Sequence, residues 1–220
     1  MTPIAHIETP YGSKFGVPRQ SGLASTEGRV VFEPQYRVAE SIRGLEEFDY
    51  IWLLWLFHLT DQEEWSPTVR PPRLGGNRRM GVFATRSPFR PNHIGLSCSR
   101  LLRVETTTNE GPVLHVEGID LVDGTPILDI KPYLPYTDAH ADARAGFATV
   151  PPKNALQVID PTGALSVMPQ KLRLSLIQSL AQDPRPHYHH DEREYTMPFG
   201  GYEITFRVNE EKTLEVITLN

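Results

Sequence analysis

Short stretches of alternating apolar and polar residues, separated by turn residues, recur along the first two thirds of the chain. Such alternation predicts β-strands, and Gly and Pro clusters mark the turns between them. A continuous apolar run at residues 50–59 predicts a strand buried on both faces. The predicted strands lie at residues 4–8, 29–32, 50–59, 80–85, 94–104, 113–119 and 127–130.

Helical patterns are sparse in this part of the chain. We expect one short helix at residues 36–47, ending near Gly44. Many strands with few helices between them favour a mainly β fold with an antiparallel or mixed sheet, such as a barrel. No G-x-G-x-x-G follows a predicted strand, so a nucleotide-like cofactor would not bind in a Rossmann crevice.

The composition changes near residues 136–161, which are rich in proline and have little periodicity. Beyond them, four apolar residues at helical spacing predict a helix at residues 169–182, with Pro169 in its first turn. Residues 202–208 and 214–219 alternate as a hairpin. We therefore expect a β-barrel domain at residues 1–150 and a small α+β domain at residues 151–220. The four apolar helix residues are Leu172, Leu176, Ile177 and Leu180.

Charge is distributed unevenly, although the net charge is only −5. Residues 70–103 contain no Asp or Glu, which indicates a local anion site, although a solvated loop face would have the same composition. Eight arginines lie in this segment, at positions 70, 73, 78, 79, 86, 90, 100 and 103. The single cysteine, Cys98, excludes an intramolecular disulfide, and with no signal peptide or membrane span apparent we expect a cytoplasmic protein.

Two loops carry side chains suited to ligand binding. In residues 13–22, the guanidinium group of Arg19 and the amide of Gln20 directly follow Pro18, although this pattern is also typical of a surface loop. Residues 86–96 hold Arg86 and Arg90 among prolines that stiffen the loop, so the pair can bind an anion bidentately. Phe89 lies between these arginines and is suited to stacking on a base.

Three further patterns each allow two interpretations. Asp129 and Lys131 share one face of the strand predicted after the turn Asp123-Gly124. They would either form the wall of a site or pair with each other on an exposed strand. His58 at the end of an apolar run is either a core residue or part of a site. The cluster His187-Tyr188-His189-His190-Asp191-Glu192 suits a metal, but no second ligand motif accompanies it, so a solvated loop is favoured and no metal is expected.

Several long segments together, in order, resemble the TrmO/TsaA-like methyltransferase family. These segments are residues 14–20, 70–77, 80–95, 120–133 and 181–186, and the resemblance covers essentially the whole chain. The resemblance implies a single-sheet β-barrel that binds S-adenosylmethionine, a small C-terminal domain and a homodimer. It also implies methylation of N6 of threonylcarbamoyladenosine at position 37 of tRNA, 3′ of the anticodon.

The resemblance also implies which residues contact the cofactor. They are Pro18, Arg19, Gln20, His58, Leu59, Arg86, Leu96, Asp123, Gly124, Thr125 and Pro126. The chain departs from the family at His93, where a second proline is common after Arg-Pro-Asn, so this loop is freer here.

The remaining roles concern the acceptor. Its nitrogen is a poor nucleophile, so Asp129 and Tyr133 are candidates for a general base, with the threonyl carboxylate of the substrate as the alternative. Substrate-binding candidates are Arg78, Arg90, Asn92 and Arg185. Two competing hypotheses are a non-catalytic tRNA-binding module, which would not bind S-adenosylmethionine, and a metal-dependent hydrolase built on the histidine cluster.

Overall fold

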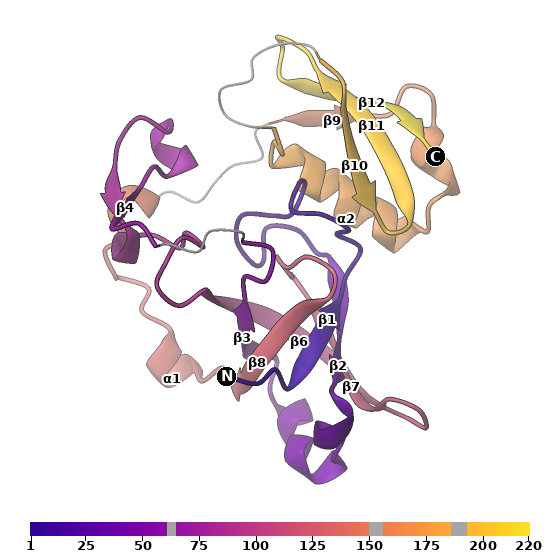
Figure 1. Cartoon of the computed structure of the whole chain (residues 1–220). Coiled ribbons are helices and arrows are strands. Elements are labelled where there is room, and N and C mark those ends of the chain that lie inside the picture. Colours follow the sequence, from indigo (N-terminus) through magenta and orange to yellow (C-terminus); the bar gives the residue numbers. More distant parts are fainter. Residues whose placement is uncertain (61–64, 150–155, 186–192) are drawn as a thin grey trace.

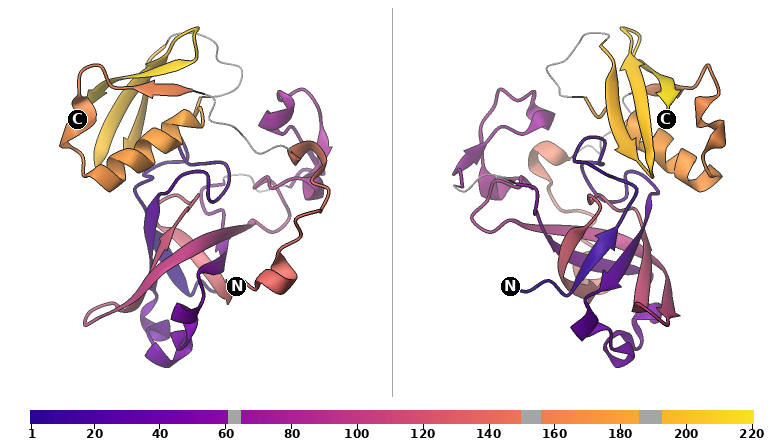
Figure 2. Two further views of the ribbon diagram at one scale, coloured as in Figure 1. Left: turned by 180° about the vertical axis from the view of Figure 1, so that it is seen from behind. Right: turned by 45° about the vertical axis from the view of Figure 1, so that its right-hand side comes forward.

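The molecule consists of a β-barrel, a C-terminal sheet with one long helix, and an arm that projects from the barrel (Figure 1). The computed structural model describes residues 1–60, 65–149, 156–185 and 193–220. The arm, residues 65–93, includes the two-stranded β4–β5 sheet, formed by Thr68–Val69 and Met80–Gly81. Both the arm and the C-terminal sheet stand at the same end of the barrel in all views (Figures 1 and 2).

Six antiparallel strands close the barrel in the order β1-β2-β7-β6-β3-β8. Their bounds are β1 Ala5–Glu8, β2 Glu27–Phe32, β3 Tyr50–Leu56, β6 Ile94–Thr107, β7 Gly111–Glu117 and β8 Thr125–Pro132. Alternate side chains fill the interior, as period-two strands require. Ile51, Leu53 and Trp55 on β3 point inward and are buried. The expected mainly β barrel is confirmed.

Three expectations about local structure are wrong. Residues 36–47 form no α-helix but 3₁₀ turns at Pro34–Tyr36, Ala39–Ile42 and Leu45–Glu47. Gly44 adopts a left-handed φ of 83° between the last two turns, which interrupts a continuous helix. The strand expected at residues 80–85 stops after Gly81 and continues as the 3₁₀ turn Val82–Ala84. The strand expected at residues 50–59 ends at Leu56, and its outward face is only half-buried.

The remaining helical turns are short. The helix α1 spans Pro135–Asp138 directly after the barrel. Three further 3₁₀ turns span Pro72–Leu74, Gly146–Ala148 and Ala164–Val167. Of the helices that the structure describes, none is long and apolar enough to cross a membrane.

The C-terminal unit is a four-stranded sheet packed against the helix α2, Gln170–Ala181. The sheet order is β10-β11-β12-β9, with β9 Gln157–Ile159, β10 Tyr195–Phe199, β11 Tyr202–Val208 and β12 Thr213–Leu219. The helix expected at residues 169–182 is confirmed, with Pro169 as its N-cap rather than in its first turn. Leu176 and Leu180 are fully buried on the face that meets the sheet.

Tyr11 joins the barrel to the C-terminal unit. Its ring lies edge-on to Phe199 at a centroid distance of 5.3 Å, and its hydroxyl hydrogen-bonds Thr26 (2.7 Å) and Ser179 (2.8 Å). Burial of this hydroxyl raises its pKa. Residues of both units also share one hydrophobic cluster, so the two parts hold a fixed relation to each other.

Candidate functional site

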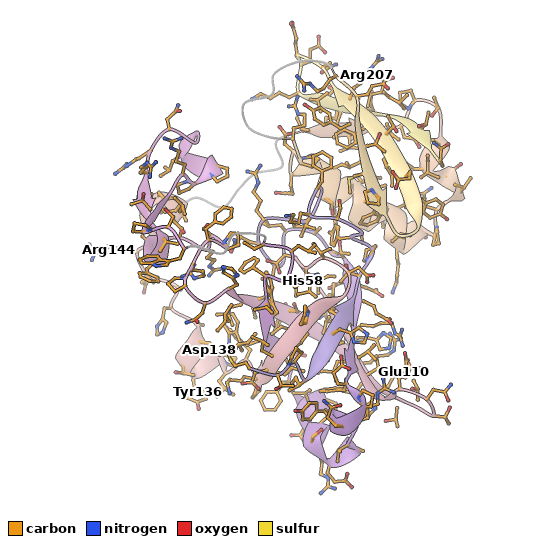
Figure 3. The ribbon with its side chains drawn as sticks, viewed as in Figure 1. His58, Glu110, Tyr136, Asp138, Arg144 and Arg207 are labelled. Atoms are coloured by element: carbon orange, nitrogen blue, oxygen red, sulfur yellow. The ribbon has the colours of Figure 1, made fainter. Side chains whose placement is uncertain are left out.

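A cleft that is open to solvent lies at the barrel end that faces the C-terminal unit and the arm. His58, just after β3, lies at this end of the barrel (Figure 3). The lining comes from the loop of residues 13–22, the end of β3, the arm, β6 and the segment before β8. Those side chains belong to Lys14, Val17, Pro18, Arg19, Gln20, Trp55, Phe57, His58, Leu59, Thr60, Arg86, Pro88, Leu96, Asp120, Leu121, Val122 and Thr125.

The aromatic wall of the cleft depends on an irregularity in β3. Pairing between β3 and β8 shifts by one position between Leu54 and Trp55, and such shifts re-aim the side chains beside them. Trp55 then meets Phe57 edge-on at 4.2 Å between centroids. Gly95 on β6 pairs opposite Trp55, and a Cβ at this glycine would lie 2.3 Å from the indole ring. Glycine is therefore required for this packing.

A buried hydrogen-bond chain leads from the aromatic wall to a carboxylate. Trp55 Nε1 donates to Ser97 Oγ at 3.0 Å, and Ser97 Oγ donates to Asp120 Oδ1 at 2.5 Å. Burial raises the pKa of Asp120 to about 6, against the lowering effects of the Ser97 hydrogen bond and the Arg86 charge. Among the described residues of the lining, Asp120 is the only carboxylate.

Three basic side chains also line the cleft, and the charge of one of them, Arg86, acts on Asp120. Arg86 donates from Nη1 to Gln20 Oε1, which ties the arm to the loop of residues 13–22. Arg19 donates from Nη2 to the carbonyl of Asp183 at 3.4 Å, so this loop also contacts the C-terminal unit. Lys14 Nζ donates to the carbonyl of Leu59 at 2.9 Å. Three separate parts of the chain thus converge on the cleft.

The turn before β8 is fixed by the barrel itself. Asp123 Oδ1 accepts from the backbone N–H of Thr9 at 2.9 Å, and Gly124 N–H donates to the carbonyl of Ile7 at 2.9 Å. Gly124 has a φ of 73°, which suits glycine in a tight turn. Thr125 lines the cleft, whereas its neighbours Asp123, Gly124 and Pro126 are not among the lining residues. All the other residues expected at the cofactor line the cleft.

The residues expected to bind substrate lie in two places. Arg78 and Asn92 are exposed on the arm, where Arg90 is half-buried. Arg185 lies in the C-terminal unit, where its Nε and Nη2 donate to the carboxylate of Asp183 at 2.9 and 3.0 Å. None of these four residues is among those that line the cleft, and Arg185 belongs to an ion pair with Asp183.

The two candidates for a general base lie outside the cleft. Asp129 pairs with Lys131 at 3.0 Å, and both side chains are about half exposed. Asp129 lines a second groove with Ile4 and Phe32. The ring of Tyr133 packs against Trp52 on the outside of the barrel, at 5.8 Å between centroids. Since a strand rises about 3.3 Å per residue, Asp129 is roughly 13 Å along β8 from Thr125.

Metal binding was expected to be absent, and the histidine cluster at residues 187–192 lies outside the described residues. Within the described residues, no group of three or more His, Cys, Asp or Glu side chains is placed to hold a metal ion.

Sequence reasoning missed Asp120, Trp55, Phe57 and Lys14 as lining residues. Asp120 follows Ile119 and precedes Leu121, both of which are buried, so its sequence neighbours alone resemble ordinary strand residues. The position of a carboxylate between two core residues could have indicated a site, because burying an acid without a partner raises the free energy of the folded state.

The donor set of the cleft fits a ligand that carries both charges. S-adenosylmethionine has a carboxylate, an ammonium, a sulfonium and an adenine ring. The cleft offers cationic groups from Lys14, Arg19 and Arg86, one carboxylate from Asp120, and an aromatic surface from Trp55. These features match each part of the cofactor by charge and polarity.

The cleft belongs to a chain with clear relatives. Residues 6–139 match the model described as the tRNA-methyltransferase O N-terminal domain, and residues 159–220 match the TrmO C-terminal domain. The tRNA (adenine(37)-N6)-methyltransferase of Escherichia coli K12 is 42% identical over 94% of this chain and 92% of the relative. A putative S-adenosylmethionine-dependent methyltransferase, RcsF, from Pseudomonas aeruginosa PAO1 is 43% identical, covering 87% of this chain and 84% of its own.

A solved structure agrees with this. The crystal structure of TrmO from Pseudomonas aeruginosa superimposes with a TM-score of 0.80 and 34% identity, over 100% of this chain and 96% of that one. Both family models match in chain order, the relatives match over most of their length, and the solved structure has the same fold. The chain belongs to the tRNA-methyltransferase O family.

Proposed function

We propose that this chain transfers a methyl group from S-adenosylmethionine to N6 of adenosine 37 in tRNA, and that the adenosine carries a threonylcarbamoyl group. The family and the names of its full-length relatives support the enzyme class and the cofactor. The observation that carries the proposal is the cleft that is lined by one carboxylate, Asp120, together with three cationic side chains.

Different residues of the cleft would bind the differently charged parts of the cofactor. Lys14, Arg19 and Arg86 suit its carboxylate, and Asp120 suits one of its cationic groups. Trp55 and Phe57 supply an apolar wall for the adenine. When bound, the cofactor supplies a methyl group on a sulfonium, which an in-line nucleophile can accept.

Positioning is the main contribution that these residues can make. The loop of residues 13–22 contacts both the arm and the C-terminal unit, so the cleft is defined by three parts in fixed relation. A fixed cleft aligns the acceptor nitrogen with the methyl group and limits the access of water. The aromatic wall of Trp55 and Phe57 excludes further solvent from the inner side.

The arginines of the arm are the natural contacts for the RNA. Arg78 and Arg90, with Asn92, lie on a segment without acids, and Arg86 and Pro88 of the same segment line the cleft. Such a segment neutralises phosphates and the threonyl carboxylate of the substrate. We assign proton acceptance to that threonyl carboxylate, because Asp129 and Tyr133 lie outside the cleft.

The domain division and the assembly also remain part of the proposal. We propose that residues 1–150 bind the cofactor, that residues 151–220 help to hold the anticodon arm, and that the enzyme is a cytoplasmic homodimer. Sedimentation equilibrium of the full chain tests the dimer, since one mass corresponds to one copy and twice that mass to two.

Nucleoside mass spectrometry tests the reaction directly. The full chain is incubated with tRNA that carries threonylcarbamoyladenosine and, separately, with the same tRNA carrying plain adenosine at position 37. We expect a cofactor-dependent gain of one methyl group only in the first sample. Methylation of both tRNAs equally would contradict the threonylcarbamoyl requirement. Binding of tRNA without binding of S-adenosylmethionine would instead favour the non-catalytic tRNA-binding module.

A further inference from the structure

Large aromatic side chains are exposed on the arm. Trp65 is 49% exposed, Phe83 72% and Phe89 41%. Exposed aromatic groups lose the stabilisation of burial, and a contiguous set of them usually marks a binding surface. The arm is also the acid-free part of the sequence, so these rings lie among arginines.

Trp65 and Phe83 form a stacked pair whose position is set by the backbone. Their ring planes meet at 24°, with 6.3 Å between centroids. Pairing of Thr68 with Gly81 and the hydrogen bond from Val82 N–H to the carbonyl of Pro67 (3.0 Å) align the two segments. The side chain of Val82 is buried and anchors the turn. The rings are thus held together although they are open to solvent.

Arg90 completes the surface. Its guanidinium carbon lies 5.9 Å from the centroid of the Phe83 ring, within the range of a cation–π contact. Its Nη1 also donates to the carbonyls of Thr85 and Ser87, both at 3.1 Å. A positive charge is therefore fixed beside an exposed ring. Arg86 and Pro88, on the same turn, line the cleft.

We propose that the Trp65–Phe83 pair is a stacking platform for one unpaired base of the substrate RNA, with Arg90 on an adjoining phosphate. The proposal rests on the proposed function, because it takes the anticodon loop as the substrate. Bases in RNA loops are unpaired and stack readily on aromatic side chains. Phe83 lies three residues before Arg86, which lines the cleft, so a base on the platform belongs to a nucleotide close to the methylated one.

Binding of a fluorescently labelled anticodon stem–loop tests the platform. Phe83→Ala and Trp65→Ala should each weaken RNA binding about tenfold, and Phe83→Leu should fail to restore it, whereas Phe83→Trp should restore it. Calorimetric titration of each variant with S-adenosylmethionine should give the wild-type affinity. Tyr136→Ala is the matched control, because Tyr136 is 86% exposed on α1, well separated from the arm (Figure 3).

A set of RNAs with one abasic loop position each identifies the stacked base. One abasic position should weaken binding to the wild type but cause no further loss with Phe83→Ala, because the two partners of one stack are coupled. Wild-type RNA affinity in both alanine variants would overturn the platform. So would a loss of RNA binding that follows a change of oligomeric mass in sedimentation, since the pair would then contact a second copy. Methylation by the wild type, measured separately, shows whether the proposed function itself holds.

Discussion

Two hollows lie toward opposite ends of strand β8, and they differ in the environment of their carboxylates. The cleft includes Thr125 at the start of the strand, whereas the second groove includes Asp129, Ile130 and Pro132 toward its end. Asp120 in the cleft is secluded and hydrogen-bonded to Ser97. Asp129 in the groove is about half exposed and paired with Lys131. The environment of the carboxylate therefore distinguishes the cleft from the second groove.

The two carboxylates should also differ in their effect on the stability of the fold. A secluded carboxylate destabilises the fold unless a ligand or a protein cation compensates it, whereas an exposed ion pair contributes little either way. Strained or costly groups of this kind are typical of binding sites. We therefore expect Asp120 to take part in ligand binding and Asp129 to belong to the surface structure of the barrel.

The largest expected effect is on cofactor affinity. Asp120→Asn should weaken S-adenosylmethionine binding by roughly 10- to 100-fold, because a hydrogen bond or contact to a charged group contributes about 1.5–3 kcal/mol. Calorimetric titration with S-adenosylmethionine and with S-adenosylhomocysteine locates the partner charge. A loss confined to S-adenosylmethionine places Asp120 at the sulfonium, and an equal loss for both ligands places it at the ammonium.

Asp129→Asn is the matched control for this experiment, since it removes one carboxylate of the same barrel. Its affinity for both ligands should equal that of the wild type. Unchanged S-adenosylmethionine affinity in Asp120→Asn would contradict the contrast between the two cavities.

A smaller effect should separate the two arginines of the arm. Arg86 lines the cleft and bonds Gln20, whereas Arg90 bonds the backbone of its own turn beside Phe83. Arg86→Ala should weaken cofactor binding about tenfold, and Arg90→Ala should weaken RNA binding by about the same factor. The RNA titration repeated at several salt concentrations should also lose about one unit of slope for Arg90→Ala. If either variant lost affinity for the cofactor and for RNA equally, the two arginines would belong to one site rather than two.

The pH dependence of stability should follow Asp120. Its folded pKa of about 6 lies above the ordinary value of 3.8. The folded state then holds a proton that the unfolded state has released, so this contribution to stability is complete below about pH 4 and is lost as the pH rises to 6. Asp120→Asn should therefore gain up to about 3 kcal/mol over the wild type between pH 4 and pH 7 in urea titrations, because each unit of pKa shift corresponds to about 1.4 kcal/mol. A difference that is constant with pH would contradict the raised pKa.

The sequence predicted the barrel well because its alternation is local. Ile51, Leu53 and Trp55 fall on one face of any extended strand, whatever the rest of the chain does. The edge strand β10 was missed because Pro198 normally argues against a strand, yet an edge position leaves its missing N–H without consequence. The strand expected at residues 80–85 ends early, because Val82 turns inward to anchor the arm.

The site was predictable only in part. Pro18, Arg19 and Gln20 follow from a motif, since contiguous residues keep their spacing in any fold. Asp120 and Trp55 lie far apart in sequence and are connected through Ser97 on β6, so only the closed barrel reveals their connection. The same argument explains Asp129 and Lys131. Their shared strand face was predicted correctly, but which cavity that face borders depends on where β8 lies in the barrel.

The smallest expected effect is on turnover by variants of the second groove. Asp129→Asn and Tyr133→Phe, alone and combined, should keep the rate of methylation within about twofold of the wild type under saturating cofactor and tRNA. Asp129 lies roughly 13 Å along β8 from the cleft, and Tyr133 packs on Trp52. A general base contributes about 10²–10⁴-fold, so its removal would be obvious in single-turnover kinetics. A loss of that size for either variant would move proton acceptance from the substrate carboxylate to this groove, and the contrast between the two cavities would no longer hold.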